Sequence, residues 1–341
     1  MADNLGSNAS LSLFNDYQNI NVMKSVDSTI VIGILARDCA NHLQVNIQKV
    51  EAMGVLFKDY HVVAYENDST DGTTELLREW ALRNPHVLSI NEKTGQMTIP
   101  QKTAATPYPG QSYLRIEKMA RFRNRVLKEV RERYQPDIFC FIDIDMEDFD
   151  PDTVVQAIDE APKDWGALFA NGQVIIDYKD HQCISPIMYD YFAYVKKGVN
   201  PYQGGDYAIR IDDNLALTYM EQRLINIRSY HPCHSAFNGI GIYRWDLIKD
   251  LEYIAYQTPE LKAVNASLCE HVPFNYEVVK QGYQLYIVRK MKTRFVHIPP
   301  HKVYHGLNKW RNYSPAIDFF IYNKPVRKLI IRNLLQVLRQ S

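Results

Sequence analysis

Short apolar runs alternate with amphipathic stretches along the first half of the chain. The apolar runs, each of strand length, lie at 29–36, 60–66, 86–92 and 137–145. The amphipathic stretches, which repeat apolar residues at helical spacing, lie at 41–53, 73–84 and 113–134, and another helix is expected from Pro151. Strands that alternate with helices predict an α/β protein with a mostly parallel sheet and helices on both faces.

The pattern changes at both ends and near the middle of the chain. Residues 1–27 are rich in Asn and Ser and predict a flexible leader before the regular half at 28–164. Residues 165–308 are rich in tyrosine and predict shorter strands and loops laid against that half. Residues 309–341 end in a basic amphipathic tail.

Polar side chains follow two of the predicted strands. "YENDSTDGT" (65–73) follows one, and "FIDID" brings Asp143 and Asp145 to the end of another. The carboxyl ends of parallel strands share one edge of a sheet, where ligands bind. Carboxylates two residues apart lie on one side of a strand and suit Mg²⁺ or Mn²⁺, which in turn suit a diphosphate. The plainer alternatives are a polar turn and a helix cap.

The helix predicted at 113–134 is strongly basic. Its basic and amide residues are Arg115, Lys118, Arg121, Arg123, Asn124 and Arg125. Positions 118, 121 and 125 share a face, which is either a solvated basic surface or a source of phosphate-binding charge.

Three motifs of the second half are candidates for chemistry. In "FNGIGIY", Asn238 and Gly239 indicate a bulge or the close approach of a ligand or another backbone. In "CEHVPF", Glu270 is either a helix cap or a general base. His297, His301 and His305 are spaced by four, but Pro299 and Pro300 prevent a helix there, so we expect at most one to join a metal bound at the acidic strand end.

Composition narrows the class of protein and its surroundings. The 341 residues include 39 basic and 39 acidic side chains, so no global field attracts nucleic acid or a membrane. The five scattered cysteines form no CxxC pair, and neither a signal-peptide pattern nor a long apolar run is present, which predicts a cytoplasmic, reducing location. The tail from 324 has basic residues and no acid, and is either a peripheral membrane helix or a terminal helix docked on the domain.

Together these motifs resemble the nucleotide-sugar-dependent glycosyltransferases of the GT-A fold. "YENDSTDGTTELL" resembles the "DGSTDGT" strand end of family 2 transferases, and "FIDID" resembles their DxD motif. The chain is more similar still to the fungal capsule-associated mannosyltransferases, which share a "YE…S.DGT" strand, an Arg-Asn pair before the acidic strand and a stretch like "MYDYFAYVKKG". The resemblance spans roughly residues 28–300.

The resemblance implies an enzyme that transfers a hexose from a UDP- or GDP-sugar to a hydroxyl of a glycan or lipid-linked acceptor, in surface polysaccharide or glycoconjugate synthesis. It places donor binding in 28–164 and acceptor binding and catalysis in 165–308. The expected donor residues are Ala36, Glu66, Asn67, Asp68, Arg121, Arg123, Asn124 and Asp143. The expected metal ligands for Mn²⁺ or Mg²⁺ are Asp143, Asp145 and His297, and the expected acceptor residues are Tyr189, Asp190, Asn238 and Gly239. Glu270 or His271 is the expected catalytic base, and the stereochemical outcome is left open because family 2 inverts and the mannosyltransferases retain.

Three other functions fit parts of the pattern. "FCFIDIDM" also matches the nucleophile strand of haloacid-dehalogenase phosphatases, although that motif normally opens the fold. A transferase-like domain that binds nucleotide sugar or glycan without turnover would carry the same motifs. A nucleotidylyltransferase is disfavoured because "ARDCANH" stands where a glycine-rich phosphate loop would be expected.

Overall fold

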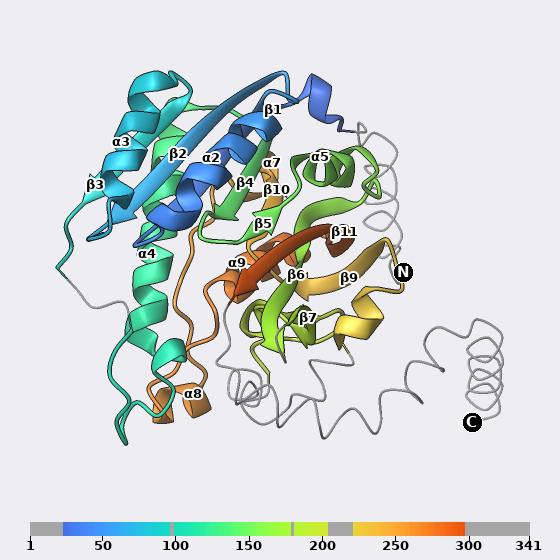
Figure 1. The fold of residues 1–341 in the computed structure, drawn as a ribbon. Helices are drawn as coiled ribbons and strands as arrows, with labels where there is room; N and C mark the ends of the chain where they lie inside the picture. Colours follow the sequence, from blue (N-terminus) through green and yellow to red (C-terminus); the bar gives the residue numbers. More distant parts are fainter. Residues whose placement is uncertain (1–22, 96–98, 179–180, 204–220, 297–341) are drawn as a thin grey trace, which may run out of the picture.

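The computed structural model describes residues 23–95, 99–178, 181–203 and 221–296, and among these one sheet of 11 strands organises the protein (Figure 1). Its main strand order is β3-β2-β1-β4-β10-β6-β11-β9-β8, with β5 beside β11 and β7 beside β6. The predicted leader and tail fall largely outside the described residues, as do His297, His301 and His305.

The first half of the sheet is parallel throughout. Its strands are β1 (Thr29–Ala36), β2 (Asp59–Asn67), β3 (Val87–Glu92) and β4 (Ile138–Asp143). β1 is buried along most of its length because helices cover both of its faces. The predicted α/β class is therefore confirmed, and each strand lies within two residues of its predicted bounds.

Two layers of helices cover the sheet. On one face lie α2 (Ala40–Gly54), α3 (Thr73–Arg83) and α5 (Pro151–Asp159), which pack with Ile30 and Ile32 of β1. On the other lie α4 (Tyr113–Arg133), α7 (Trp245–Ile248) and α9 (His271–Lys280), which pack with Val31. Polar caps start two of these helices: the Ser112 hydroxyl accepts the amide of Arg115 in α4, and the Asp150 carboxylate accepts that of Asp152 in α5.

The second half of the sheet is mixed. Its strands are β5 (Asp148–Phe149), β6 (Trp165–Tyr178), β7 (His181–Met188), β8 (Val195–Lys196), β9 (Tyr230–Ser235), β10 (Ile240–Arg244) and β11 (Gln284–Val296), and a short helix, α8, covers Pro259–Ala263. β10 runs antiparallel between β4 and β6, whereas β6 and β11 are parallel. We expected short strands here, but β6 has 14 residues and β11 has 13. Buried polar residues such as Asn171 and Gln173 interrupt the apolar pattern of β6 and hide its length.

The boundary predicted at residue 164 does not interrupt the sheet, because β4 of the first half pairs directly with β10 of the second. Among the described residues, short 3-10 helices lie at Ser25–Asp27, Pro109–Gln111 and Tyr191–Ala193. The first falls within the predicted leader, where the amide of Ser25 donates to Asp159 Oδ1 (2.8 Å) and fastens residues 25–27 to α5.

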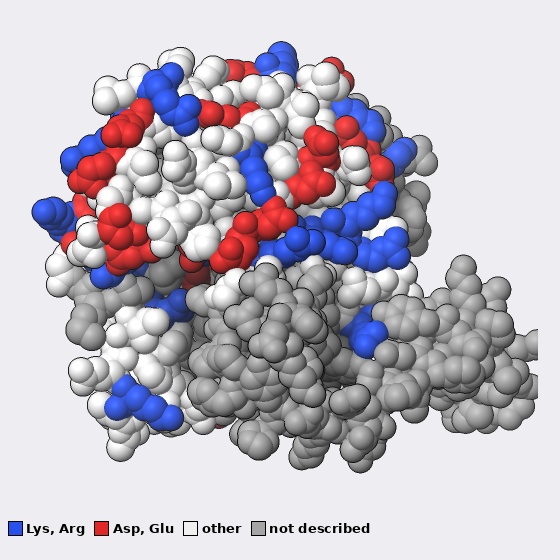
Figure 2. All heavy atoms as spheres, viewed as in Figure 1, with Lys and Arg blue, Asp and Glu red and all other residues white. Residues whose placement is uncertain are grey.

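The described surface carries both signs of charge. Figure 2 shows acidic and basic side chains interspersed over the visible face, in keeping with a formal net charge of zero. Within the part of the chain that the structure describes, no helix is both long and apolar enough to cross a bilayer.

Candidate active site

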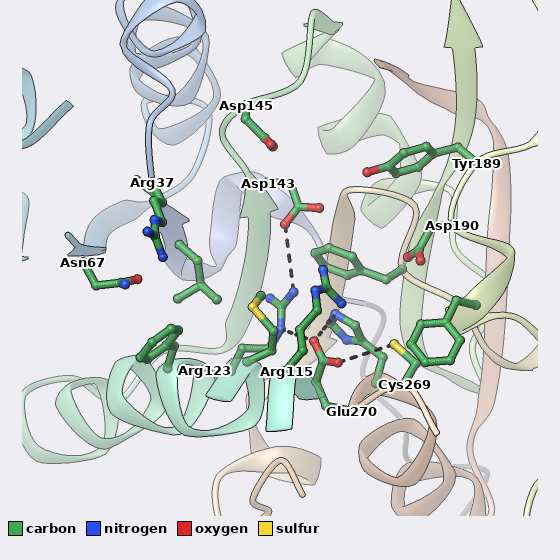
Figure 3. A pocket seen from close by; sticks show the side chains of 17 residues that line it. Arg37, Asn67, Arg115, Arg123, Asp143, Asp145, Tyr189, Asp190, Cys269 and Glu270 are labelled. Carbon is green, nitrogen blue, oxygen red and sulfur yellow. Dashed lines mark hydrogen bonds and ion pairs between the residues drawn. The ribbon is translucent and has the colours of Figure 1, made fainter. Parts of the chain in front are cut away.

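A pocket of about 290 Å³ opens at the carboxyl end of β1, β2 and β4 (Figure 3). Side chains from both halves of the sheet line it. They are Leu35, Ala36, Arg37, Asn67, Arg115, Met119, Phe122, Arg123, Asp143, Asp145, Tyr189, Asp190, Phe192, Phe237, Cys269, Glu270 and His271. The pocket therefore lies at the strand ends where the sequence analysis expects ligands to bind.

The two acids of the DxD motif lie at the mouth of this pocket. β4 ends at Asp143, whose amide donates to the carbonyl of Gly239 (2.8 Å), while Asp145 follows in an exposed turn. Burial raises the pKa of Asp143 well above its usual range, the Arg123 guanidinium lowers it, and the Asp145 carboxylate raises it further. A cation between the two acids would relieve this repulsion.

The donor atoms at this point suit a hard divalent cation. Asp143 and Asp145 offer carboxylate oxygens, and Mg²⁺ and Mn²⁺ commonly take one or two protein carboxylates together with substrate phosphates. Among the described residues these two acids have no third His, Cys, Asp or Glu positioned to complete a metal-binding group with them. The residues present therefore fit a metal whose remaining ligands come from water and a diphosphate.

A buried ion pair forms the floor of the pocket. Arg123 Nε donates to Glu270 Oε1 (3.1 Å), and the two side chains are each about 5% exposed. The guanidinium also lies over the rings of Phe237 (4.8 Å) and Phe141 (5.0 Å) and 3.9 Å from Asp143 Oδ1. Burial is the largest influence on the pKa of Arg123 and acts to lower it, but Glu270, Tyr253 and Asp143 together outweigh burial, and the net shift is upward.

Glu270 is thus neither a simple helix cap nor a free carboxylate. It stands at the start of α9 without a capping hydrogen bond, and its second oxygen accepts from Cys269 Sγ (3.6 Å). His271 stacks on Phe237 (4.0 Å), and its Nε2 lies 3.9 Å from Glu270 Oε1. Burial and the nearby Arg123 hold the pKa of His271 well below its usual range, so its imidazole is neutral.

Tyr189 and Asp190 form the opposite wall. Tyr189 stacks face to face on Phe295 (3.7 Å), and Asp190 has a left-handed backbone (φ 55°). Asp190 Oδ2 accepts the amide of Asn238 (3.3 Å), and no cation pairs with this carboxylate among the described residues. Burial raises the pKa of Asp190 to about 7.

Asn238 and Gly239 shape this wall from behind, and neither lines the pocket. Both have positive φ (58° and 88°), and a Cβ on Gly239 would lie 2.5 Å from the ring of Phe295. The Asn238 side chain donates to the carbonyl of Ala170 (2.7 Å). The close approach indicated by the glycine is therefore to a neighbouring ring of this chain.

The residues predicted to hold the nucleoside separate into two groups. Ala36 and Asn67 line the pocket, whereas Glu66 and Asp68 do not. The carboxylate of Glu66 accepts the amide of Ser69 (2.7 Å) and closes the turn after β2. Asp68 accepts from the hydroxyl of Thr94 (2.6 Å), which lowers the pKa of Asp68, so its carboxylate fastens the segment after β3.

Helix α4 turns a different face to the pocket from the one predicted. Arg115, Met119, Phe122 and Arg123 line the pocket and share one face, whereas Arg121 is exposed and lies outside it. The side chain of Asn124 donates to the carbonyl of Tyr253 (2.8 Å) and accepts the backbone amide of the same residue (2.7 Å). Of the donor residues predicted on this helix, Arg123 lines the pocket, whereas Arg121 and Asn124 do not; Arg115 of the same helix also lines it.

Sequence reasoning also missed Arg37 and the aromatic lining. Arg37 follows β1 directly, so the strand-end rule that found Asn67 and Asp143 would have found it too. Phe192 lies in a single-turn 3-10 helix and Phe237 in a loop, where residue spacing gave no signal.

Comparison with known protein families identifies the class of enzyme. A family model described as Cryptococcal mannosyltransferase 1 matches residues 30–209, just over half of the chain. The chain is similar in structure to the mannosyltransferase PcManGT of Pyrobaculum calidifontis, solved with GDP-Man and Mn²⁺ (TM-score 0.47, 11% identity, 94% of this chain and 72% of that one). It is also similar to S. aureus TarS (TM-score 0.40, 13% identity, 87% of this chain and 40% of that one). A third similar structure is GalNAc-T7 with UDP, GalNAc and Mn²⁺ (TM-score 0.43, 12% identity, 87% of this chain and 50% of that one). Comparison with curated proteins gave no match.

The protein is a glycosyltransferase with an α/β fold, as the resemblance predicted. Within that class, the chain belongs to the cryptococcal mannosyltransferase 1 family. Membership of this family excludes the alternative of a haloacid-dehalogenase phosphatase.

Proposed function

We propose that this protein transfers mannose from a nucleoside-diphosphate donor to a hydroxyl of a glycan or lipid-linked acceptor, in a reaction that requires Mn²⁺ or Mg²⁺. The choice of sugar rests on the family, which is described as a mannosyltransferase family. The observation that carries the rest is the meeting of Asp143 and Asp145 with Arg115 and Arg123 in one pocket. Carboxylates for a divalent cation and guanidinium groups for phosphate oxygens are the pair of groups that a diphosphate leaving group needs.

On the donor side, we assign metal binding to Asp145 and Asp143, with Asp145 at the open edge. When bound there, the metal supplies positive charge that stabilises the diphosphate as it leaves. Arg115 binds phosphate oxygens, while Ala36 and Asn67 face the nucleoside. Glu66 and Asp68 act indirectly by holding the turns around Asn67 in place.

On the acceptor side, we assign the hydroxyl contact to Asp190. The alternative, Glu270, is engaged by Arg123 in the buried ion pair, so removing a proton from an acceptor would compete with that pair. Asp190 faces the same pocket with one backbone hydrogen bond, which leaves an oxygen available to a hydroxyl. Glu270 then positions Arg123, and neutral His271 packs beside it.

The first experiment is a thermal-shift panel with GDP, UDP, GDP-mannose and UDP-sugars, each with and without Mn²⁺. We expect metal-dependent stabilisation by one nucleotide family, because a ligand that binds the folded state raises the melting temperature. The donor identified in this way is then used in a transfer assay with glycan and lipid-linked acceptors, and NMR of the product anomer gives the stereochemical outcome.

The decisive variant is Asp145→Asn. We expect transfer to fall by at least about 100-fold, the scale of removing one preorganised electrostatic group, with the melting temperature unchanged. Asp250→Asn, which changes an exposed acid after α7, is the matched control and keeps full activity. Full activity in Asp145→Asn would contradict the metal assignment, and donor binding without transfer in the unmodified protein would identify a binding module.

A further inference from the structure

Three potential metal ligands gather at the opposite end of the parallel strands from the pocket. Asp59 and His61 are two residues apart at the start of β2, so they lie on the same side of the strand. His86 precedes β3 and comes beside His61 because the strand register pairs Val62 with Val87. The amide of Val62 donates to the carbonyl of His86 (2.9 Å) and fixes this neighbourhood.

The spacing of the three side chains suits a single cation. One ligand atom from each lies within 4.8 Å of the other two, and His61 Nε2 is 3.6 Å from Asp59 Oδ2. Zinc bonds of about 2.0 to 2.1 Å in tetrahedral geometry set neighbouring ligand atoms about 3.3 Å apart. Small side-chain rotations would close the remaining gap.

Aromatic neighbours hold both imidazoles. His61 stacks on Tyr134 and His86 on Tyr60, each with ring centroids 4.5 Å apart. The carbonyl of Tyr60 lies 2.8 Å from Nδ1 of His86, which can donate to it. His86 Nδ1, which also lies 3.7 Å from Asp59 Oδ1, stays with the Tyr60 carbonyl in that tautomer, and the lone pair of Nε2 is then available to a metal. A hydrogen bond from the second ring nitrogen is the usual way in which a protein orients a histidine ligand.

We propose that Asp59, His61 and His86 form a Zn²⁺ site, with water as a fourth ligand. Two imidazoles and one carboxylate select zinc and its late-transition-metal neighbours over Mn²⁺ or Mg²⁺, whereas Asp143 and Asp145 select the reverse.

A metal at this site would stabilise the fold and would take no part in the chemistry of the pocket. β3 stands at the end of the main strand order, and His86 lies just before it. A metal shared between His86 and the two β2 residues would tie this strand to its neighbour. Because the ligands belong to the amino-terminal ends of the strands, the metal would lie away from the donor and acceptor groups.

The test uses the full chain, stripped of metal with a chelator and titrated with Zn²⁺, Mn²⁺ and Co²⁺. We expect Zn²⁺ to raise the melting temperature by several degrees and Mn²⁺ alone to leave it unchanged at the same concentration. The chain has other histidines, so the comparison of variants decides the matter: His61→Gln and His86→Gln should weaken zinc binding at least about 10-fold. His42→Gln, which removes a half-buried histidine paired with Glu147, is the matched control and should bind as the unmodified protein does.

Co²⁺ gives a readout that does not depend on stability. Bound at the proposed site it should show the intense visible absorption of a tetrahedral cobalt centre, which His61→Gln should abolish. Zinc affinity unchanged in both glutamine variants, or no zinc binding by the unmodified chain, would overturn the proposal. Circular dichroism of each metal-free variant separates a lost site from a lost fold.

Discussion

The two ends of the parallel strands carry different chemistry and different degrees of burial. At the carboxyl end, Arg123 and Glu270 are each about 5% exposed, and each depends on the other. At the amino end, the side chains of Asp59, His61 and His86 are 50%, 33% and 38% exposed. A buried charge needs its partner, whereas a half-exposed side chain has water as a substitute. The pocket end should therefore be intolerant of substitution and the amino end tolerant.

The largest expected difference comes from breaking the buried ion pair. Arg123→Met leaves the carboxyl group of Glu270 buried without its partner, and should lower the free energy of unfolding by about 3 to 5 kcal/mol. His61→Gln in metal-free protein should change it by less than about 1 kcal/mol, as is usual for partly exposed positions. Urea denaturation of both variants measures the contrast.

Two controls sharpen this result. Arg121→Met changes an exposed arginine on the same helix and should be nearly neutral. The double variant Arg123→Met with Glu270→Leu removes both charges and should recover much of the lost stability. Equal stabilities for Arg123→Met and Arg121→Met would mean that the pair does not support the pocket.

The backbone behind the pocket should be the next most sensitive feature. Gly239→Ala combines a positive φ with a contact of 2.5 Å to Phe295, and should cost more than about 1 kcal/mol through strain alone. Gly72→Ala isolates the conformational term, because Gly72 has φ of 92° and open space around it. Thermal unfolding of both variants should show a larger loss of stability for Gly239→Ala. Equal losses of stability would mean that the contact with Phe295 contributes nothing.

Substitution of Asp190 should have a smaller effect on stability, and this effect should depend on pH. Its native pKa is about 7 because it is buried, so between pH 4 and 7 the folded state holds a proton that the unfolded state has released. Stability from this group is therefore present at low pH and lost as pH rises through about 7. Asp190→Asn, which stays neutral, should be more stable than the unmodified protein at pH 8, by about 1 to 3 kcal/mol, with little difference at pH 4.

The charged groups that face Asp190 are Glu270, Arg123 and Arg115, which Asp190→Asn leaves in place. Asp59→Asn, at the half-exposed amino end, should change metal-free stability by less than about 0.5 kcal/mol at either pH. A stability difference for Asp190→Asn that does not vary with pH would contradict the assigned burial of this carboxylate.

The parallel half of the fold was predictable because its signals are local. An apolar run such as "TIVIGILA" needs only its own residues to define a buried strand, and β1 occupies these positions. The parallel order then brought Asn67, Asp143 and Asp145 to one edge without any long-range information. The length of β6 was not predictable in this way, because Asn171 and Gln173 are satisfied or packed by residues distant in sequence.

The orientation of α4 required the tertiary structure. Its sequence offers basic residues on several faces, and only packing against the sheet decides that Arg123 turns inward and Arg121 outward. The histidine cluster shows the same limit, since the spacing of Asp59 and His61 is visible in the sequence but the arrival of His86 depends on the register of β2 and β3.

The pairing of β4 with β10 restricts how this enzyme can exchange its ligands. The amide of Asp143, at the end of β4, donates to the carbonyl of Gly239, and the antiparallel ladder continues from Ile240 to Arg244. Hinge motion between the two halves of the protein is therefore unfavourable, because it would break several hydrogen bonds of this ladder at once. We therefore expect substrate entry and product release to involve rearrangements at the rim of the pocket, with the pairing of β4 and β10 intact.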